Sequence, residues 1–350
     1  MAGGIGVRDM FWELAGVPAV AARRGPRVES LHHVAVCAAD ADGDVVLKAG
    51  TIETPVFLRS SAKPFIAAAS VRAGVLERFG FGDRELALMC ASHSGEPGHV
   101  EVVAAMLQRI GATVDDLACG AHAPSYEPAA AALAARGERP SALHNNCSGK
   151  HTGILALAKT IGAPFEGYLE PGHPAQRLVL AMCERVSDDV FDGDKLAVDG
   201  CGIPVYATTL RKAATSFARL ATLRGVADDD AAALARVASA MATEPWYVAG
   251  TGRFDTDLMR ATSGRVVCKG GAEGVHCDAL LDAGLGVALN VIDGTRRATA
   301  PATLAVLDAL RALEPAARSA LRQHAVVPVK NVAGRVTGEV AALEGWLSAG

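Results

Sequence analysis

The sequence lacks the features that mark several large classes of protein. It has no block of basic residues of the kind that binds nucleic acid, it has no acidic tail, and its net charge is only −4. No stretch approaches the roughly 18 consecutive apolar residues of a transmembrane helix. We therefore expect neither a nucleic-acid ligand nor a membrane location, and the composition favours a small-molecule substrate.

The eight cysteines are scattered along the chain and include no CxxC pair. The first residues also lack the basic segment and long apolar run of a secretory signal peptide. We therefore expect a cytoplasmic protein with reduced thiols, in which most cysteines serve as small buried hydrophobic residues.

Lysine is scarce as well, because only eight of the 34 basic residues are lysines. Arginine stays protonated in proteins, whereas lysine can lose its proton. A lysine that lies beside a serine or a cysteine in this arginine-rich chain is therefore a candidate for a neutral, reactive amine. The alternative is that these are ordinary charged lysines on the protein surface, which we expect for about half of the eight.

What the sequence contains is a long apolar chain with strand patterns near both ends. Two strands are expected within residues 28–50, around a turn at 40–43, and three more at 265–271, 274–281 and 284–294. Helical spacing is found at 98–110, 128–136, 151–160, 174–187, 208–223, 228–242 and 301–314.

The strands at the two ends must meet to bury their apolar faces. The predicted fold class is therefore α/β, with one sheet built from both ends of the chain and a helical region inserted between them. Residues 1–20 are expected to form a loosely attached extension, and residues 21–350 a single catalytic domain.

The segment Arg59-Ser60-Ser61-Ala62-Lys63-Pro64 precedes a predicted helix, and proline is favoured in a first helical turn. Residues three apart share a helix face, so the Ser60 hydroxyl and the Lys63 amine are expected to come within hydrogen-bond reach. A neutral lysine can then act as general base for a nucleophilic serine. A surface serine and lysine are the simpler interpretation of this pattern taken alone.

Two later motifs strengthen the catalytic interpretation. Serine enzymes with a Ser-x-x-Lys motif also carry a second serine motif and a Lys-x-Gly strand motif. Here these are Ala91-Ser92-His93-Ser94-Gly95 and Cys268-Lys269-Gly270-Gly271, in the same order along the chain.

Cysteine and lysine also occur together in residues 143–151 and again near residues 198–204. The first segment contains Cys147, Lys150 and His151, and the second contains Asp199 and Cys201 on a glycine-rich turn. Two thiolates with such neighbours can hold zinc. The spacing fits no standard zinc-finger pattern, so a polar turn that caps a helix is the alternative.

The segment Gly250-Thr251-Gly252-Arg253-Phe254-Asp255 is a further candidate. Its glycines permit close approach of a ligand to the backbone, and Arg253 can bind a carboxylate. A turn with an Arg–Asp pair is an equal alternative. No Gly-Lys-Ser/Thr sequence follows, which excludes a phosphate-binding loop.

Six of these motifs, in this order, resemble the signature of the Rhizobium-type L-asparaginases, and the resemblance runs from about residue 23 to 345. The motifs are RSSAKPF, CASHSGE, LHNNCSGKH, VDGCGIP, GTGRFDT and CKGGAEG. The resemblance implies a fold similar to serine β-lactamases and bacterial glutaminases. It also implies hydrolysis of L-asparagine to L-aspartate and ammonia, and a homodimer.

The resemblance further implies roles for individual residues. Ser60 with Lys63, and Ser92 with Lys269, are implied as two catalytic pairs. Zinc is implied at Cys147, Lys150 and Cys201, with water as a further ligand. The residues expected to bind the substrate are Arg59, Asn146, Gly271 and Glu273.

Three functions remain open from the sequence. The first is an L-asparaginase that forms an acyl-enzyme on Ser60. The second is a glutaminase or other small-amide hydrolase, because one methylene group of substrate length changes binding by only about 1–3 kcal/mol. The third is a catalytically silent protein that binds an amino acid.

Overall fold

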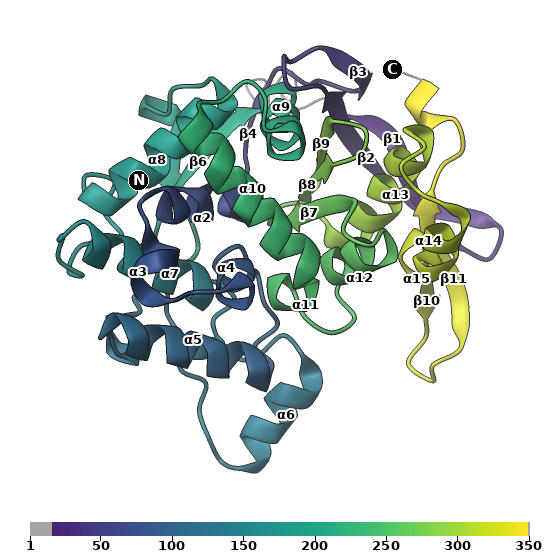
Figure 1. Cartoon of the computed structure of the whole chain (residues 1–350). Helices are drawn as coiled ribbons and strands as arrows, with labels where there is room; N and C mark the ends of the chain where they lie inside the picture. The colour runs from purple at the N-terminus through teal and green to yellow at the C-terminus, as the bar shows by residue number, and fades with distance from the viewer. Residues whose placement is uncertain (1–15, 349–350) are drawn as a thin grey trace, which may run out of the picture. The chain divides into compact units, whose positions relative to one another are not determined.

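The computed structural model describes residues 16–348, which form a mixed α/β structure in two compact units. Unit 1 comprises residues 16–58, 207–222 and 270–348, and unit 2 comprises residues 59–206 and 223–269. Each unit is therefore assembled from segments that are distant in sequence. Figure 1 labels the elements of both units.

Unit 1 contains an antiparallel sheet in which the strands follow the order β10-β11-β1-β2-β9-β8, and β3 pairs with β2. The strands of unit 1 are β1 (Val17–Arg24), β2 (Arg27–Ala39), β3 (Val45–Ala49), β4 (Pro55–Phe57), β8 (Val275–Leu280), β9 (Leu285–Val291), β10 (Val326–Lys330) and β11 (Val336–Ala342), of which β4 lies outside this sheet. The N-terminal and C-terminal strands meet as expected, with Val34 opposite Val291. Val20 of β1 lies opposite Ala342 of β11, a pairing that was not predicted.

Helices cover this sheet within unit 1. They are α9 (Leu210–Thr222), α13 (Thr299–Ala309), α14 (Pro315–Ala320) and α15 (Arg322–Ala325). Helix α9 packs against β2, β8 and β9, and α13 packs against β1, β8, β9 and β11. The inner ends of β2 and β9 are fully buried, so apolar strand residues form the core of the unit.

Unit 2 is the helical region inserted between the two groups of strands. Its helices are α2 (Lys63–Arg72), α3 (Val75–Phe79), α4 (Asp83–Met89), α5 (Pro97–Ile110), α6 (Glu127–Ala135), α7 (Ser148–Thr160), α8 (Pro174–Ser187), α10 (Asp228–Thr243), α11 (Pro245–Val248) and α12 (Phe254–Ala261). Strand β5 (Leu196–Val198) pairs with the start of β6 (Pro204–Thr209), and β7 (Val266–Gly270) leads back to unit 1.

Helix α2 lies at the centre of unit 2 and is buried on every side from Lys63 to Ser70. It packs against α7, α8 and α10, and its phenylalanine, isoleucine and alanines fill the space between them. The buried Asp230 of α10 binds Arg72 at the end of α2 and Arg185 of α8, with nitrogen–oxygen distances of 2.9 and 2.7 Å. These ion pairs fix the helix whose first residue is Lys63.

The expected fold class is confirmed, with differences at the edges of the elements. Strand β1 begins at Val17, so residues 17–20 of the expected extension belong to the sheet. Residues 1–15 of that extension lie outside the described residues. No helix in residues 16–348 is both long and apolar enough to cross a lipid bilayer.

Candidate active site

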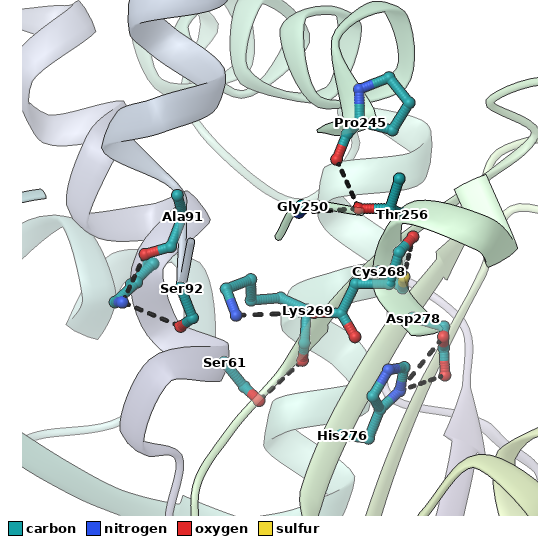
Figure 2. A network of polar contacts seen from close by, with 12 residues as sticks. Ser61, Ala91, Ser92, Pro245, Gly250, Thr256, Cys268, Lys269, His276 and Asp278 are labelled. Atoms are coloured by element: carbon teal, nitrogen blue, oxygen red, sulfur yellow. Dashed lines mark hydrogen bonds and ion pairs between the residues drawn. The ribbon is translucent and has the colours of Figure 1, made fainter. Parts of the chain in front are cut away.

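The Ser-x-x-Lys segment forms a 3-10 turn (η1, Arg59–Ala62) that leads directly into α2. Lys63 is only 1% exposed, and its amine donates hydrogen bonds to the Ala91 carbonyl and, at 3.0 Å, to the Ser92 hydroxyl. In Figure 2 the dashed lines from Ala91 and Ser92 meet at this one nitrogen. Within residues 16–348, no hydrogen bond joins Ser60 to Lys63. The structure therefore brings Lys63 to Ser92, a pairing that the sequence did not predict.

Burial is the main influence on the Lys63 amine and lowers its pKa. The positive charge of Lys150 lowers this pKa further, while Cys147 and Cys201 raise it. The net effect is a pKa below the ordinary value for lysine. Lys63 can therefore reach the neutral form that a general base requires.

Ser92 lies in a buried loop that connects α4 to α5. Its backbone N–H donates to the Val248 carbonyl at 3.0 Å, and the N–H of His93 donates to the Asn146 carbonyl at 3.2 Å. The His93 ring accepts from the N–H of Gly95 through Nδ1, so Nε2 carries the proton that faces Ser148 Oγ, 2.9 Å away. Two neighbouring segments thus hold the Ser92 loop from both sides.

The same loop is joined to the segment at residues 249–253 by the buried carboxylate of Glu96. One oxygen accepts from Ser94 Oγ at 2.7 Å and from the Thr251 N–H at 2.8 Å, and the other accepts from Thr251 Oγ1 at 2.7 Å. Gly250 has a φ of +119°, and a Cβ there would lie 2.0 Å from Ser94 Oγ. Only glycine fits this close approach. No local pattern predicts the pairing of Glu96 with Thr251, because the two residues are far apart in the chain.

Lys269, at the end of β7, is fully buried, and in Figure 2 its side chain points toward Ser92. Its carbonyl accepts a hydrogen bond from Ser61 Oγ at 2.8 Å, and its amine lies 3.6 Å from Asp255 Oδ2. Burial lowers the pKa of Lys269 to about 8, although the Asp255 carboxylate acts in the opposite direction. Both predicted catalytic lysines are therefore buried amines with lowered pKa values.

Cys147, Lys150 and Cys201 converge inside unit 2, and each is at most 7% exposed. Cys147 caps the start of α7, Lys150 lies in its first turn, and Cys201 lies between β5 and β6. Lys150 Nζ is 2.8 Å from Cys201 Sγ, and the two thiols are hydrogen-bonded to each other. The sequence prediction that these residues form one cluster is consistent with this geometry.

The two cysteines share their proton unequally. The hydrogen bond from Cys201 holds the pKa of Cys147 well below its usual range, against the effect of burial. The same hydrogen bond, together with burial, raises the pKa of Cys201. Cys147 is thus the thiolate of the pair. Two sulfur donors and one nitrogen donor suit a zinc ion by number and by type.

Glycine packing explains part of the Cys-Ser-Gly-Lys motif without any chemistry. A Cβ at Gly149 would lie 2.2 Å from the Leu88 carbonyl oxygen, so α7 can approach α4 only because residue 149 is glycine. Gly149 therefore serves packing, while Lys150, the next residue, contacts Cys201.

Arg59 and Asp199 connect the cysteine cluster to the Ser60 turn. Arg59 Nε donates to Asp199 Oδ1 at 2.7 Å, and Asp199 Oδ2 lies 3.9 Å from Cys201 Sγ. Arg59 has a φ of +51°, a rare conformation for a residue other than glycine and one often found at functional sites. Although burial opposes it, the Lys150 charge and the Arg59 hydrogen bond lower the pKa of Asp199.

The other predicted site residues have varied surroundings. The backbone N–H of Asn146 donates to His122 Nε2 at 3.0 Å, and Asn146 Oδ1 lies 3.4 Å from the same nitrogen. His151 Nδ1 contacts the Tyr168 hydroxyl at 2.7 Å. Gly271 and Glu273 belong to unit 1, in the turn before β8, where Glu273 has a φ of +54°.

Comparison with known proteins identifies the family of the chain. The sequence model of the family described as L-asparaginase II matches residues 20–342. The chain therefore belongs to the L-asparaginase II family, and membership places it among hydrolases of the amidohydrolase type. No curated protein matches the chain.

Solved structures with a similar chain trace include a β-lactamase (Mb2281c) from Mycobacterium bovis. It is 17% identical, with a TM-score of 0.40 over 83% of this chain and 94% of the other. The protein Mglu is 15% identical, with a TM-score of 0.37 over 80% of this chain and 67% of the other.

Proposed function

We propose that the protein hydrolyses L-asparagine to L-aspartate and ammonia through an acyl-enzyme on Ser60. The observation that carries the proposal is the position of Lys63. Its amine is buried, has a lowered pKa, contacts Ser92 Oγ at 3.0 Å, and follows Ser60 by three residues at the start of α2. A buried amine of this kind, three residues after Ser60, supports its role as the base that activates Ser60.

In the first step, Ser60 Oγ forms a bond to the side-chain amide carbon of asparagine. Lys63 takes the hydroxyl proton, and the carbonyl oxygen becomes an oxyanion. Backbone N–H groups at the start of α2 are suited to stabilise that charge, and loss of one such donor typically lowers the rate by about 10²–10³-fold.

In the second step, the carbon–nitrogen bond breaks and ammonia leaves. The leaving nitrogen needs a proton, and the contact between Lys63 and Ser92 supports a relay in which Ser92 passes the Lys63 proton onward. Lys269 supports the relay as a second buried amine. Water then attacks the acyl carbon, Lys63 accepts its proton, and aspartate is released with Ser60 restored.

We also propose that Cys147, Lys150 and Cys201 hold a zinc ion, with water as a further ligand. The fit rests on three buried donor atoms that converge, two of them sulfur. Bound zinc would supply a fixed positive charge that neutralises the thiolates. Because Ser60 provides the nucleophile, the ligand residues serve to hold the turns that carry Asp199 and Asn146 in place.

The experiment that tests the function is an ammonia-release assay on L-asparagine, L-glutamine and short amides. We expect L-asparagine to be the best substrate. Ser60→Ala should abolish turnover while the protein still folds. The neighbouring Ser61→Ala variant should still form the acyl-enzyme. Mass spectrometry of the quenched reaction should find the acyl group on Ser60.

Three outcomes would contradict the proposal. Near wild-type turnover in Ser60→Ala would exclude Ser60 as nucleophile. An adduct on Ser92 alone would exchange the roles of the two serines. Saturable binding of amino acid without release of ammonia would indicate a binding protein.

A further inference from the structure

Arg253 occupies a defined place beside the candidate catalytic residues. It precedes the first residue of α12, and Asp255, two residues later, lies 3.6 Å from the Lys269 amine. Gly250 and Thr251, shortly before Arg253 in the chain, are held by hydrogen bonds. Thr251 makes two to Glu96, and the N–H of Gly250 donates to Thr256 Oγ1 at 3.1 Å. Figure 2 shows the Gly250–Thr256 contact next to Lys269. The backbone that carries Arg253 is thus fixed to the Ser92 loop.

The Arg253 guanidinium has no hydrogen-bond or ion-pair partner within residues 16–348, although its side chain is partly buried. The acids around it are already engaged. Asp255 faces Lys269, and both oxygens of Glu96 are saturated by Ser94 and Thr251. A partly buried cation without an anion is costly unless a ligand supplies the negative charge.

Arg59, which also lies near the candidate catalytic residues, does have an ion-pair partner. Arg59 donates through Nε to Asp199 at 2.7 Å. The positive charge of Arg253 also reaches the centre of the site, because it contributes to lowering the pKa of both Lys269 and His99. The cation that remains to receive an anionic group from a substrate is therefore Arg253.

We propose that Arg253 binds the α-carboxylate of the substrate and thereby restricts the enzyme to amides of α-amino acids and related acids that carry a free carboxylate. This inference rests on the proposed function. A guanidinium offers paired N–H donors that match the two oxygens of a carboxylate. The hydrogen bonds of Thr251 to Glu96 tie this anchor to the loop that carries Ser92, so a substrate held by Arg253 has its side-chain amide among the candidate catalytic residues.

The test compares three amides that differ by one group each. L-Asparagine has both the α-amino group and the α-carboxylate, succinamate lacks the amino group, and 3-aminopropanamide lacks the carboxylate. In Arg253→Ala we expect kcat/KM to fall about 10–100-fold for asparagine and succinamate, the loss typical of a charged hydrogen-bonded contact. For 3-aminopropanamide it should remain within about twofold of wild type. Inhibition by L-aspartate should weaken by a similar factor.

The matched control is Arg260→Ala, an exposed arginine on the same helix, which should leave all kinetic constants unchanged. Arg253→Lys should recover only part of the lost kcat/KM for asparagine, because lysine keeps the positive charge but lacks the paired N–H donors of a guanidinium. If Arg253→Ala lowers turnover of all three amides alike, or leaves aspartate inhibition unchanged, the inference is overturned while the proposed function stands. If the wild-type protein hydrolyses none of the amides, the proposed function is wrong and the inference falls with it.

Discussion

The Lys63 amine and the Ser92 hydroxyl lie 3.0 Å apart, although the two residues are 29 positions apart in the sequence. The carbonyl of Ala91 accepts a hydrogen bond from the same amine. Lys63 is therefore held from the Ser92 side as well as by its own helix. A base in contact with the Ser92 hydroxyl can exchange a proton with that hydroxyl.

Ser92→Ala should lower kcat about 10²–10⁴-fold, because it removes the hydroxyl through which protons reach the leaving nitrogen. KM should change little, since the substrate contacts remain. Rapid-quench kinetics should show that acylation of Ser60 slows while an acyl adduct still forms. Unchanged kcat in this variant would exclude Ser92 from the proton relay.

The activity should depend on pH through Lys269, whose pKa burial lowers to about 8. If the neutral amine is the working form, kcat/KM rises with pH through that value. Asp255 raises this pKa more than Cys268 does, so Asp255→Asn should move the rise to lower pH. The groups that act on the Lys269 amine are Asp255, Lys63, Arg253 and Cys268.

The measurement is the pH profile of kcat/KM for wild type and variant. Asp257→Asn, in the same first turn of α12, serves as the control and should leave the profile in place. A rise that stays fixed in Asp255→Asn, or one that moves to higher pH, would contradict the assignment of this titration to Lys269.

Metal analysis of protein purified without chelator should find about one zinc per chain, as for a tetrahedral site. Cys201→Ala should lose the metal, because it removes one of two sulfur donors. Cys183→Ala, another buried cysteine of unit 2, should retain it. Protein that is metal-free and fully active, and that zinc does not affect, would exclude the site.

Gly250→Ala should reduce activity strongly, because the new Cβ would meet Ser94 Oγ at 2.0 Å and Glu96 Oε1 at 2.6 Å at a φ of +119°. The loop would have to move and would take Thr251 and Arg253 with it. Gly252→Ala is the matched control, since its φ of +68° is also positive but no atom lies within 4 Å of the added Cβ. Both variants should be compared by kcat/KM and by thermal unfolding. Equal losses of activity would show that backbone strain alone, and not the close contact, determines the effect.

Local patterns in the sequence were sufficient for much of the fold. The alternation and turn residues of 28–50 predicted β2 and β3, and the apolar runs near residues 265–294 correspond to β7, β8 and β9. Strands β10 and β11 were not predicted, because Pro328 and the polar residues between them resemble a loop. The pairing of β11 with both β10 and β1 stabilises these strands, although their own sequences do not favour strand structure.

The candidate site was predictable as a set of residues but not as a set of contacts. Spacing suggested that Ser60 would meet Lys63, since residues three apart share a helix face. The amine instead extends to Ala91 and Ser92, because Ser60 lies in a 3-10 turn before the helix. The contacts of Glu96 with Thr251 and of Asp255 with Lys269 depend on how distant segments pack, which no local pattern reveals.

The pairing of β1 with β11 places a constraint on how the chain acquires its structure during synthesis. Val20 emerges from the ribosome early and its partner Ala342 almost at the end, so β1 can pair only with β2 until more than 300 further residues have been made. Contacts of such high sequence separation slow folding and leave strand edges exposed to other chains. Unit 2 interrupts unit 1 twice, and it has all of its segments available by residue 269. The helical unit that carries the two proposed catalytic lysines can therefore become compact while the sheet is still incomplete, and completion of the sheet is the step most exposed to aggregation.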